Sequence, residues 1–388
     1  MSENPNAPLG APWPRPQQVA PPAPAPESAP QPTPPPSPQR RWRIVALVAG
    51  LVVLLGLTGF TITRYVLRQP PPPKPPSQPF DIGGAYARVR PGVANVEAVL
   101  ATGQGVASGT GIVLGADGLV LTNNHVVEGS IVVRVTLAGG RVHDAKVLGY
   151  DRSHDLAVLK LAGVSGLPTA TLGDSGQVKP GDYVLGVGNA GGQGGEPASA
   201  VGRVTALGRS IVARDAETGA TETLHDLIQT DAPVRQGDSG GPLTDTAGRV
   251  IGVNVAGSAG YAVEKGEHES YTIPITPAAE IAGQIAAGKE SGSIHIGPSA
   301  YLGMTVNETA DGAGAMIQAL VQKGPADEAG LKAGLLVVGV GDQPVRSAAD
   351  LIAQMDRHHP GETLKFTITG QGGQQATVSV QAASGPIG

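Results

Sequence analysis

Between Phe80 and Ala256 the chain alternates short apolar runs with turns rich in glycine, asparagine and aspartate. These runs are Ile112–Leu114, Leu119–Leu121, Ile131–Val135, Leu156–Leu161, Tyr183–Val187, Val201–Ala206 and Val250–Val255. Many short strands at such spacing are typical of a β-barrel or a β-sandwich. We therefore expect a mainly β structure here, and the pattern alone leaves both architectures open.

Two proline-rich segments precede this region. Residues 1–40 hold 15 of the 35 prolines and show no apolar periodicity, which predicts a disordered, polyproline-like tail over 1–43. The second stretch, Pro70–Pro79, contains Lys74 as its only charge. It predicts a semi-rigid stalk over 67–79.

An uncharged run of 20 residues, Ile44–Thr63, lies between the two proline-rich segments and follows a cluster of arginines. As a helix it would be about 30 Å long, which is the thickness of a bilayer core. The alternative is a long signal peptide, whose apolar region is normally about 7–15 residues and ends at a small-residue cleavage site. We expect a retained transmembrane helix over 44–66, with a cytoplasmic N-terminus and the rest of the chain extracytoplasmic.

Composition excludes several kinds of chemistry. The chain has no cysteine, so disulfides, a cysteine nucleophile and a cysteine-based metal site are excluded. From Arg64 onward acidic residues outnumber basic ones, which argues against nucleic acid or anionic lipid as the main partner. At 388 residues the chain is long enough for two or more domains.

The motif with the most chemical content is Gly237–Leu243, which reads Gly-Asp-Ser-Gly-Gly-Pro-Leu. Its small residues leave the Ser239 hydroxyl and nearby backbone N–H groups uncrowded, as a serine nucleophile with an oxyanion hole requires. His125 ends one apolar run and Asp155 begins another. The order His, Asp, Ser is that of chymotrypsin-type triads, whereas lipase-like hydrolases run Ser, Asp, His. Each residue alone has an ordinary structural interpretation, but together they predict a catalytic triad.

With these motifs, the segment from Thr110 to Val255 resembles the trypsin-like HtrA/DegP serine proteases, and locally the secreted actinobacterial (mycobacterial PepA-type) members with a PDZ domain. The other matching motifs are Gly109–Val113, Thr122–Val127, Asp155–Leu159 and Gln229–Pro233. The resemblance implies two six-stranded β-barrels with the triad in the cleft between them. It also implies no cofactor and no metal.

The resemblance assigns a role to each residue of the site. His125 is expected to be the general base, Asp155 the residue that orients it and Ser239 the nucleophile. The backbone N–H groups of Gly237 and Ser239 are expected to form the oxyanion hole. These roles predict hydrolysis through an acyl-enzyme.

One departure from the family lies beside the nucleophile. HtrA members usually have Asn before this serine, whereas this chain has Asp238, as the digestive proteases do. In those enzymes the aspartate pairs with a new N-terminus formed on zymogen cleavage, but no Ile-Val-Gly-Gly-type activation site precedes Gly109. We expect Asp238 to pair with Arg235 or to stay solvated, and the means of activating the oxyanion loop stays open.

The substrate pocket is the next expectation from the family. The residue six before the nucleophile lies at the pocket base, and here it is the uncharged Pro233, which excludes a trypsin-like preference for Arg or Lys. Asp231 is expected to brace the loop. We expect the pocket wall to include Gly257, Ser258 and Ala259, and cleavage to follow small to medium aliphatic residues.

Residues Pro277 to Ala287 predict a helix that closes a protease domain over 80–288, and a short linker is expected over 289–298. Beyond it, Tyr301-Leu302-Gly303-Met304 and Gly324–Gly334 resemble a PDZ domain of the HtrA type, which implies a small α+β domain over 299–383. Its first loop would bind a peptide's C-terminal carboxylate while the peptide adds as a strand. A helix from Ala348 to Arg357 would line this groove.

Three further interpretations concern this domain. Leu335-Leu336 depart from the family, which commonly has an acidic residue after the glycine. His358 and His359 are assigned to a polar face rather than to a metal site. An appendage that binds nothing is the alternative to peptide recognition.

Together these features predict a membrane-anchored, extracytoplasmic serine endopeptidase that cleaves misfolded or specific envelope proteins and recognises peptide C-termini. A catalytically silent or latent, chaperone-like peptide-binding sensor is the alternative, and a peptide-ester hydrolase is a third. Family members often trimerise through aromatic N-terminal segments. Phe80 and Tyr86 are the candidates for such a homotrimer contact.

Overall fold

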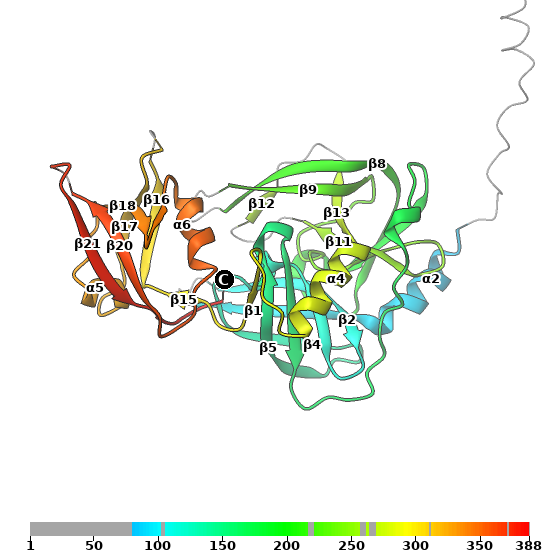
Figure 1. Cartoon of the computed structure of the whole chain (residues 1–388). Helices are drawn as coiled ribbons and strands as arrows, with labels where there is room; N and C mark the ends of the chain where they lie inside the picture. Colours follow the sequence, from blue (N-terminus) through cyan, green and yellow to red (C-terminus); the bar gives the residue numbers. More distant parts are fainter. Residues whose placement is uncertain are drawn as a thin grey trace, which may run out of the picture. The chain divides into compact units, whose positions relative to one another are not determined.

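The computed structural model describes residues 80–387 except 102–104, 216–220, 257–260, 264–268, 310–311 and 371. Within this part the chain forms two β-barrels and a small α+β domain, as Figure 1 shows. The expected tail, transmembrane helix and stalk, residues 1–79, lie outside the described residues. Among the helices of the described residues, none combines the length and the hydrophobicity needed to cross a bilayer.

The described chain begins with the amphipathic helix α2 (Ile82–Val89), which is capped by the Asp81 carboxylate. Its buried residues pack against the second barrel. Phe80 packs against Tyr183, with ring centroids 5.9 Å apart, and the Tyr86 hydroxyl donates to the Pro197 carbonyl. Both aromatic residues expected to mediate trimerisation therefore contact their own domain.

Six antiparallel strands of the described chain close the first barrel in the order β5-β4-β1-β2-β3-β6, with β5 pairing to β6. They are β1 (Val93–Leu100), β2 (Val106–Gly115), β3 (Leu119–Thr122), β4 (Ser130–Thr136), β5 (Val142–Asp151) and β6 (Leu156–Leu161). Val96, Val120 and Leu159 are fully buried in its interior.

The second barrel closes in the order β8-β7-β10-β11-β13-β9, with β8 pairing to β9. Its strands are β7 (Tyr183–Gly188), β8 (Ala198–Asp215), β9 (Thr221–Thr230), β10 (Pro242–Thr244), β11 (Val250–Val255) and β13 (Ser270–Pro274). A further strand, β12 (Tyr261–Val263), pairs with β8. The predicted pair of six-stranded barrels is confirmed, and each gains one extra strand at its edge.

Short helices join these strands. They are η1 (Arg90–Gly92), α3 (Asn124–Val127), η2 (Arg152–His154), η3 (Ser175–Gln177) and η4 (Ala190–Gly192). Two of them lie at residues of the predicted triad: α3 contains His125, and η2 ends directly before Asp155.

The helix predicted over 277–287 is α4 (Ile275–Ala286), which begins two residues earlier and is followed by Gly288 at φ +65°. Its buried face contacts β5 and β6 of the first barrel and β11 of the second. The segment expected to be a linker contains strand β14 (Ile294–Ile296), which pairs with β5. This short strand therefore extends the sheet of the first barrel beside β5, with Ile294 and His295 buried.

The C-terminal domain has a sheet in the order β16-β17-β18-β20-β21, with β19 paired to β18. The elements are β15 (Ala300–Tyr301), β16 (Met304–Glu308), β17 (Ala315–Leu320), α5 (Pro325–Glu328), β18 (Leu336–Val340), β19 (Gln343–Pro344), α6 (Ala348–Met355), β20 (Thr363–Thr369), β21 (Gln375–Gln381) and β22 (Ala383–Ser384). Phe366 fills the core of this domain. The predicted α+β class is confirmed, with α6 inside the expected range.

Candidate active site

His125 and Asp155 meet where the ends of two neighbouring strands of the first barrel come together. His125 lies on α3, just after β3, and Asp155 directly precedes β6, to which β3 is paired. Asp155 has φ 50° and ψ 49°, a left-handed conformation that is uncommon for a residue other than glycine. Such strain persists only where surrounding contacts fix the residue, and here Asn123 donates to the Asp155 carbonyl at 2.8 Å.

The Asp155 carboxylate holds His125 at two points. Oδ2 lies 2.8 Å from the ring Nδ1, and Oδ1 accepts from the His125 backbone N–H at 3.0 Å. Both residues are buried, with 7% and 1% of their surfaces exposed. A carboxylate at Nδ1 fixes the ring tautomer with the proton on Nδ1, which makes Nε2 the basic nitrogen.

Ser239 is fully buried on the loop between β9 and β10. Its hydroxyl donates to the Ala256 carbonyl and accepts from the Ala256 N–H at 3.1 Å. Proton transfer to His125 therefore requires the hydroxyl to turn away from Ala256.

The loop before Ser239 needs glycine at position 237. Gly237 has φ +94°, and a Cβ there would lie 2.1 Å from the Asn189 carbonyl oxygen. No acceptor in the described part of the chain takes a hydrogen bond from the N–H of Gly237 or of Ser239. Donors left open to a reacting oxygen are what an oxyanion hole requires.

Thr110, to which the sequence motifs assign no role, also contacts this loop. Its hydroxyl donates to the Gly237 carbonyl at 2.7 Å and accepts from the Asn189 N–H at 2.9 Å. Its backbone N–H donates to the Ser239 carbonyl at 2.7 Å. Strand β2 thus holds the loop on both sides of Asp238. A threonine inside the apolar motif Gly109–Val113 was the available signal.

Asp238 is buried, so the expectation of a solvated carboxylate is wrong. Its Oδ2 accepts from the Arg235 backbone N–H at 2.9 Å, and no ion pair joins it to the Arg235 guanidinium among the described residues. Burial raises the pKa of the Asp238 carboxyl above its ordinary value, against the opposing hydrogen bond and charge of Arg235. The expected partner is thus present through its backbone.

Only some of the residues expected to form the pocket lie within the described part of the chain. Pro233 is exposed on the loop between β9 and β10. Asp231 accepts from the Arg203 N–H at 2.6 Å, which ties this loop to β8. Gly257, Ser258 and Ala259 lie outside the described residues, so their role stays a prediction.

A cleft lies in the C-terminal domain. Tyr301, Leu302, Gly303 and Met304, the residues expected to bind a carboxylate, together line a cleft of about 190 Å³. Its opposite wall comes from α6 through Leu351, Ile352 and Met355. Arg152, from the protease part of the chain, also lines it.

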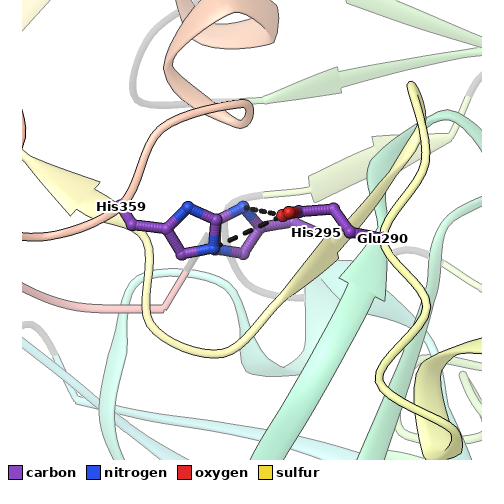
Figure 2. A group of neighbouring side chains, drawn as sticks. All are labelled: Glu290, His295 and His359. Atoms are coloured by element: carbon purple, nitrogen blue, oxygen red, sulfur yellow. Dashed lines mark ion pairs between the residues drawn. The ribbon is translucent and has the colours of Figure 1, made fainter.

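Figure 2 shows a third group of polar side chains, Glu290, His295 and His359. The Glu290 carboxylate lies 3.8 Å from His295 Nδ1 and 3.4 Å from His359 Nε2. The two imidazole rings stack with centroids 4.7 Å apart. Two histidines and a carboxylate are a common metal-ligand set, so this group is a candidate metal site.

The hydrogen bonds of the rings argue against metal binding. His295 has the Asp356 carbonyl 2.7 Å from Nδ1 and the Pro298 carbonyl 3.0 Å from Nε2. His359 Nε2 lies 3.1 Å from the Ile296 carbonyl. A metal ion binds the lone pair of an unprotonated ring nitrogen. A nitrogen that donates to a carbonyl oxygen carries a proton instead, so metal binding would cost that hydrogen bond. The group fits a hydrogen-bonded ionic network better than a metal centre.

Comparison with known proteins supports the division of the chain. Residues 109–253 match the trypsin-like peptidase domain family, and residues 300–381 match the PDZ domain family. The serine protease PepD of Mycobacterium tuberculosis is 34% identical over 78% of this chain and 66% of its own length. The putative serine protease HhoA of Synechocystis is 33% identical over 71% of this chain and 70% of its own length.

A solved structure, HtrA-type protease AlgW with tripeptide, is 29% identical and covers 79% of this chain and 98% of its own, with a TM-score of 0.46. That score is too low for structural detail to be carried over. The chain spans 50% to 63% of the length of several other relatives, among them proteins described as probable periplasmic serine endoproteases.

Proposed function

The chain belongs to the HtrA-like family of trypsin-type serine proteases with a C-terminal PDZ domain, and from this we propose that it is a serine endopeptidase acting on protein substrates. The observation that carries the proposal is the buried His125–Asp155 pair, in which the carboxylate holds both the ring Nδ1 and the backbone N–H of His125. Such a pair makes a histidine a competent base for a serine nucleophile.

The proposed mechanism uses only groups of this chain. His125 Nε2 takes the Ser239 proton as the serine oxygen attacks the scissile carbonyl, and Asp155 stabilises the imidazolium that forms. The N–H groups of Gly237 and Ser239 bind the developing oxyanion. His125 then returns the proton to the leaving amine, and water hydrolyses the acyl-enzyme. Since the Ser239 hydroxyl is bonded to Ala256 at rest, it must turn before attack.

The cleft lined by Tyr301–Met304 and α6 is proposed to hold the C-terminal end of a peptide. Gly303 has φ +70°, a conformation that glycine adopts without strain. Strand addition beside β16 would supply backbone hydrogen bonds, and the apolar side chains of α6 would contact the last residues. Misfolded or specific envelope proteins are the proposed substrates.

We also propose a membrane anchor over 44–66, with the protease and PDZ domains on the extracytoplasmic side. The support is the uncharged run Ile44–Thr63, which is long enough as a helix to cross a bilayer core. A protease accessibility assay on intact cells and on permeabilised cells tests it. Cleavage of the C-terminal domains only after permeabilisation would contradict this orientation.

The experiment that tests the activity compares the full-length chain, purified in mild detergent, with its Ser239→Ala variant. We expect casein cleavage and fluorophosphonate labelling in the wild type and neither in the variant. Ser210→Ala is the matched control, since this serine is exposed on β8, where its hydroxyl lies 3.0 Å from His225 Nδ1. Labelling without cleavage would indicate a latent enzyme. Loss of both in a folded wild type would favour the chaperone-like sensor.

A further inference from the structure

Asp238 lies between the two residues whose N–H groups are proposed to form the oxyanion hole. Only 5% of its surface is exposed. Its backbone N–H donates to the Arg235 carbonyl at 2.9 Å, and its carbonyl accepts from Gly241 at 3.0 Å. Its side chain packs against the end of β7, where a Cβ on Gly188 would lie 2.6 Å from Oδ1. Any rearrangement of this side chain therefore moves the residues on both sides of it.

The two carboxylate oxygens of Asp238 differ in their hydrogen bonding. Oδ2 accepts one hydrogen bond from the Arg235 N–H. Oδ1 is buried and has no hydrogen-bond partner among the described residues. An ionised carboxylate accepts hydrogen bonds through both oxygens and is costly to bury without them. The side chain would therefore be stable here in its neutral form.

The charged group that faces this carboxyl among the described residues is Arg235, whose positive charge and N–H both favour ionisation. Arg235 is exposed, so water screens much of its charge. Burial acts in the opposite direction and is the larger effect. The neighbouring β2 and β7 contribute Thr110 and Gly188, which carry no charge.

We propose that Asp238 is a positioning residue that holds the oxyanion loop in its catalytic form only while its carboxyl is protonated. Ionisation would place an unpaired charge on the residue next to Ser239, and the loop would have to open so that water could hydrate the carboxylate. Opening would carry the N–H groups of Gly237 and Ser239 away from the reacting oxygen. The proposal rests on the proposed serine protease function and adds a pH-dependent control of that site.

The sign of the pH effect follows from the geometry. A carboxyl held in its neutral form favours the folded loop fully below the ordinary pKa of aspartate, about 3.9. That contribution is lost as the pH rises through the raised pKa of Asp238. The enzyme should therefore lose activity as the pH rises through that raised pKa and be largely latent above it.

The test replaces the carboxyl with an uncharged group of the same shape, Asp238→Asn, in the full-length protein. We expect kcat of the variant to exceed that of the wild type by about tenfold at pH 8, with KM little changed. The ratio should fall toward one as the pH is lowered. Asp231→Asn is the matched control, because Asp231 also accepts from a backbone N–H but is exposed. Its pH profile should have the shape of the wild-type profile.

A ratio that does not change with pH, or a variant less active than wild type at every pH, would overturn the proposal. Urea unfolding at pH 5 to 8 gives a second reading that needs no activity. Asp238→Asn should gain stability relative to the wild type as the pH rises, whereas a constant difference contradicts the proposal. If neither protein reacts with fluorophosphonate at any pH, the proposed protease function fails, and the unfolding data still decide the role of Asp238.

Discussion

At the scale of single residues, the groups proposed to be catalytic depend on partners from distant parts of the chain. Asp155 holds His125 through both oxygens, and Thr110 holds the carbonyls on either side of Asp238. The sequence motifs predicted which residues react, since a triad needs particular side chains in a particular order. They did not assign a role to Thr110, because a hydroxyl that bonds backbone groups can come from many positions.

Asp155→Asn should lower kcat by about 10³ to 10⁴, because an amide no longer fixes the productive tautomer of His125. Peptide hydrolysis measured beside thermal unfolding checks this, and the melting temperature should change little. Asp144→Asn serves as the control, since Asp144 is exposed and makes only a loose pair with Arg134 at 3.9 Å. Retention of full activity would argue against the triad.

Thr110→Val should destabilise the protein by about 1 to 3 kcal/mol, since the Gly237 carbonyl and the Asn189 N–H would each lose a buried partner. We expect kcat to fall by about tenfold as the oxyanion loop loosens. Urea unfolding and peptide hydrolysis measure the two effects. Thr110→Ser, which keeps the hydroxyl, should restore most of both, and equal defects in the two variants would contradict this role.

At the scale of elements, the apolar runs predicted β2, β3, β4, β6, β7, β8 and β11. Strand β5 was not predicted because its first half alternates exposed polar residues and has few large apolar ones. Strand β14 was not predicted because three residues carry too little periodicity to be recognised. Both are strands because partners in the barrel supply their hydrogen bonds, which local sequence does not reveal.

The helix α6 offers a test of the PDZ cleft at this scale. Ser347 caps it by accepting from the Asp350 N–H at 2.9 Å. Ser347→Ala should cost about 1 kcal/mol of stability and weaken peptide binding, because α6 forms one wall of the cleft. Isothermal titration with a C-terminal peptide and thermal unfolding measure these effects. Ser347→Asp keeps the cap and should behave like the wild type; a defect equal to that of Ser347→Ala would exclude capping as the cause.

At the scale of the whole described unit, a half-buried polar bridge joins the protease part to the PDZ domain. Arg152 of η2 binds Asp356, at the end of α6, with Nε 2.8 Å from Oδ2, and it also pairs with Glu128. The Tyr150 hydroxyl donates to Asp356 at 2.8 Å. Arg152 lies three residues before Asp155, so the bridge links the PDZ cleft to the triad region.

Arg152→Ala should lower the free energy of unfolding by about 1 to 2 kcal/mol, because Asp356 and Glu128 would each lose an ionic partner in a half-buried place. It should also speed limited proteolysis between the two domains. Urea unfolding and a proteolysis time course measure both. Arg134→Ala is the control, as its pair with Asp144 is exposed and should contribute little. Equal effects of the two changes would contradict the bridge.

The group in Figure 2 supplies a prediction about metals. Since the nitrogens of His295 already face carbonyl oxygens, adding zinc or a chelator should leave the melting temperature unchanged. Thermal unfolding with equimolar Zn²⁺ and with excess EDTA measures this. A rise in melting temperature with zinc that is absent in His359→Ala would show a metal site after all.

The sequence by itself determined the mainly β class and predicted a triad in a definite order, because periodicity and reactive side chains are local properties. Only the tertiary structure decided that Asp238 is buried with one oxygen unpartnered among the described residues, that Thr110 holds the loop Gly237–Ser239, and that Ile294–Ile296 adds a strand to the first barrel. It also brought Arg152 to the PDZ cleft. Burial and hydrogen bonding depend on contacts between residues far apart in the chain, and no local pattern encodes them.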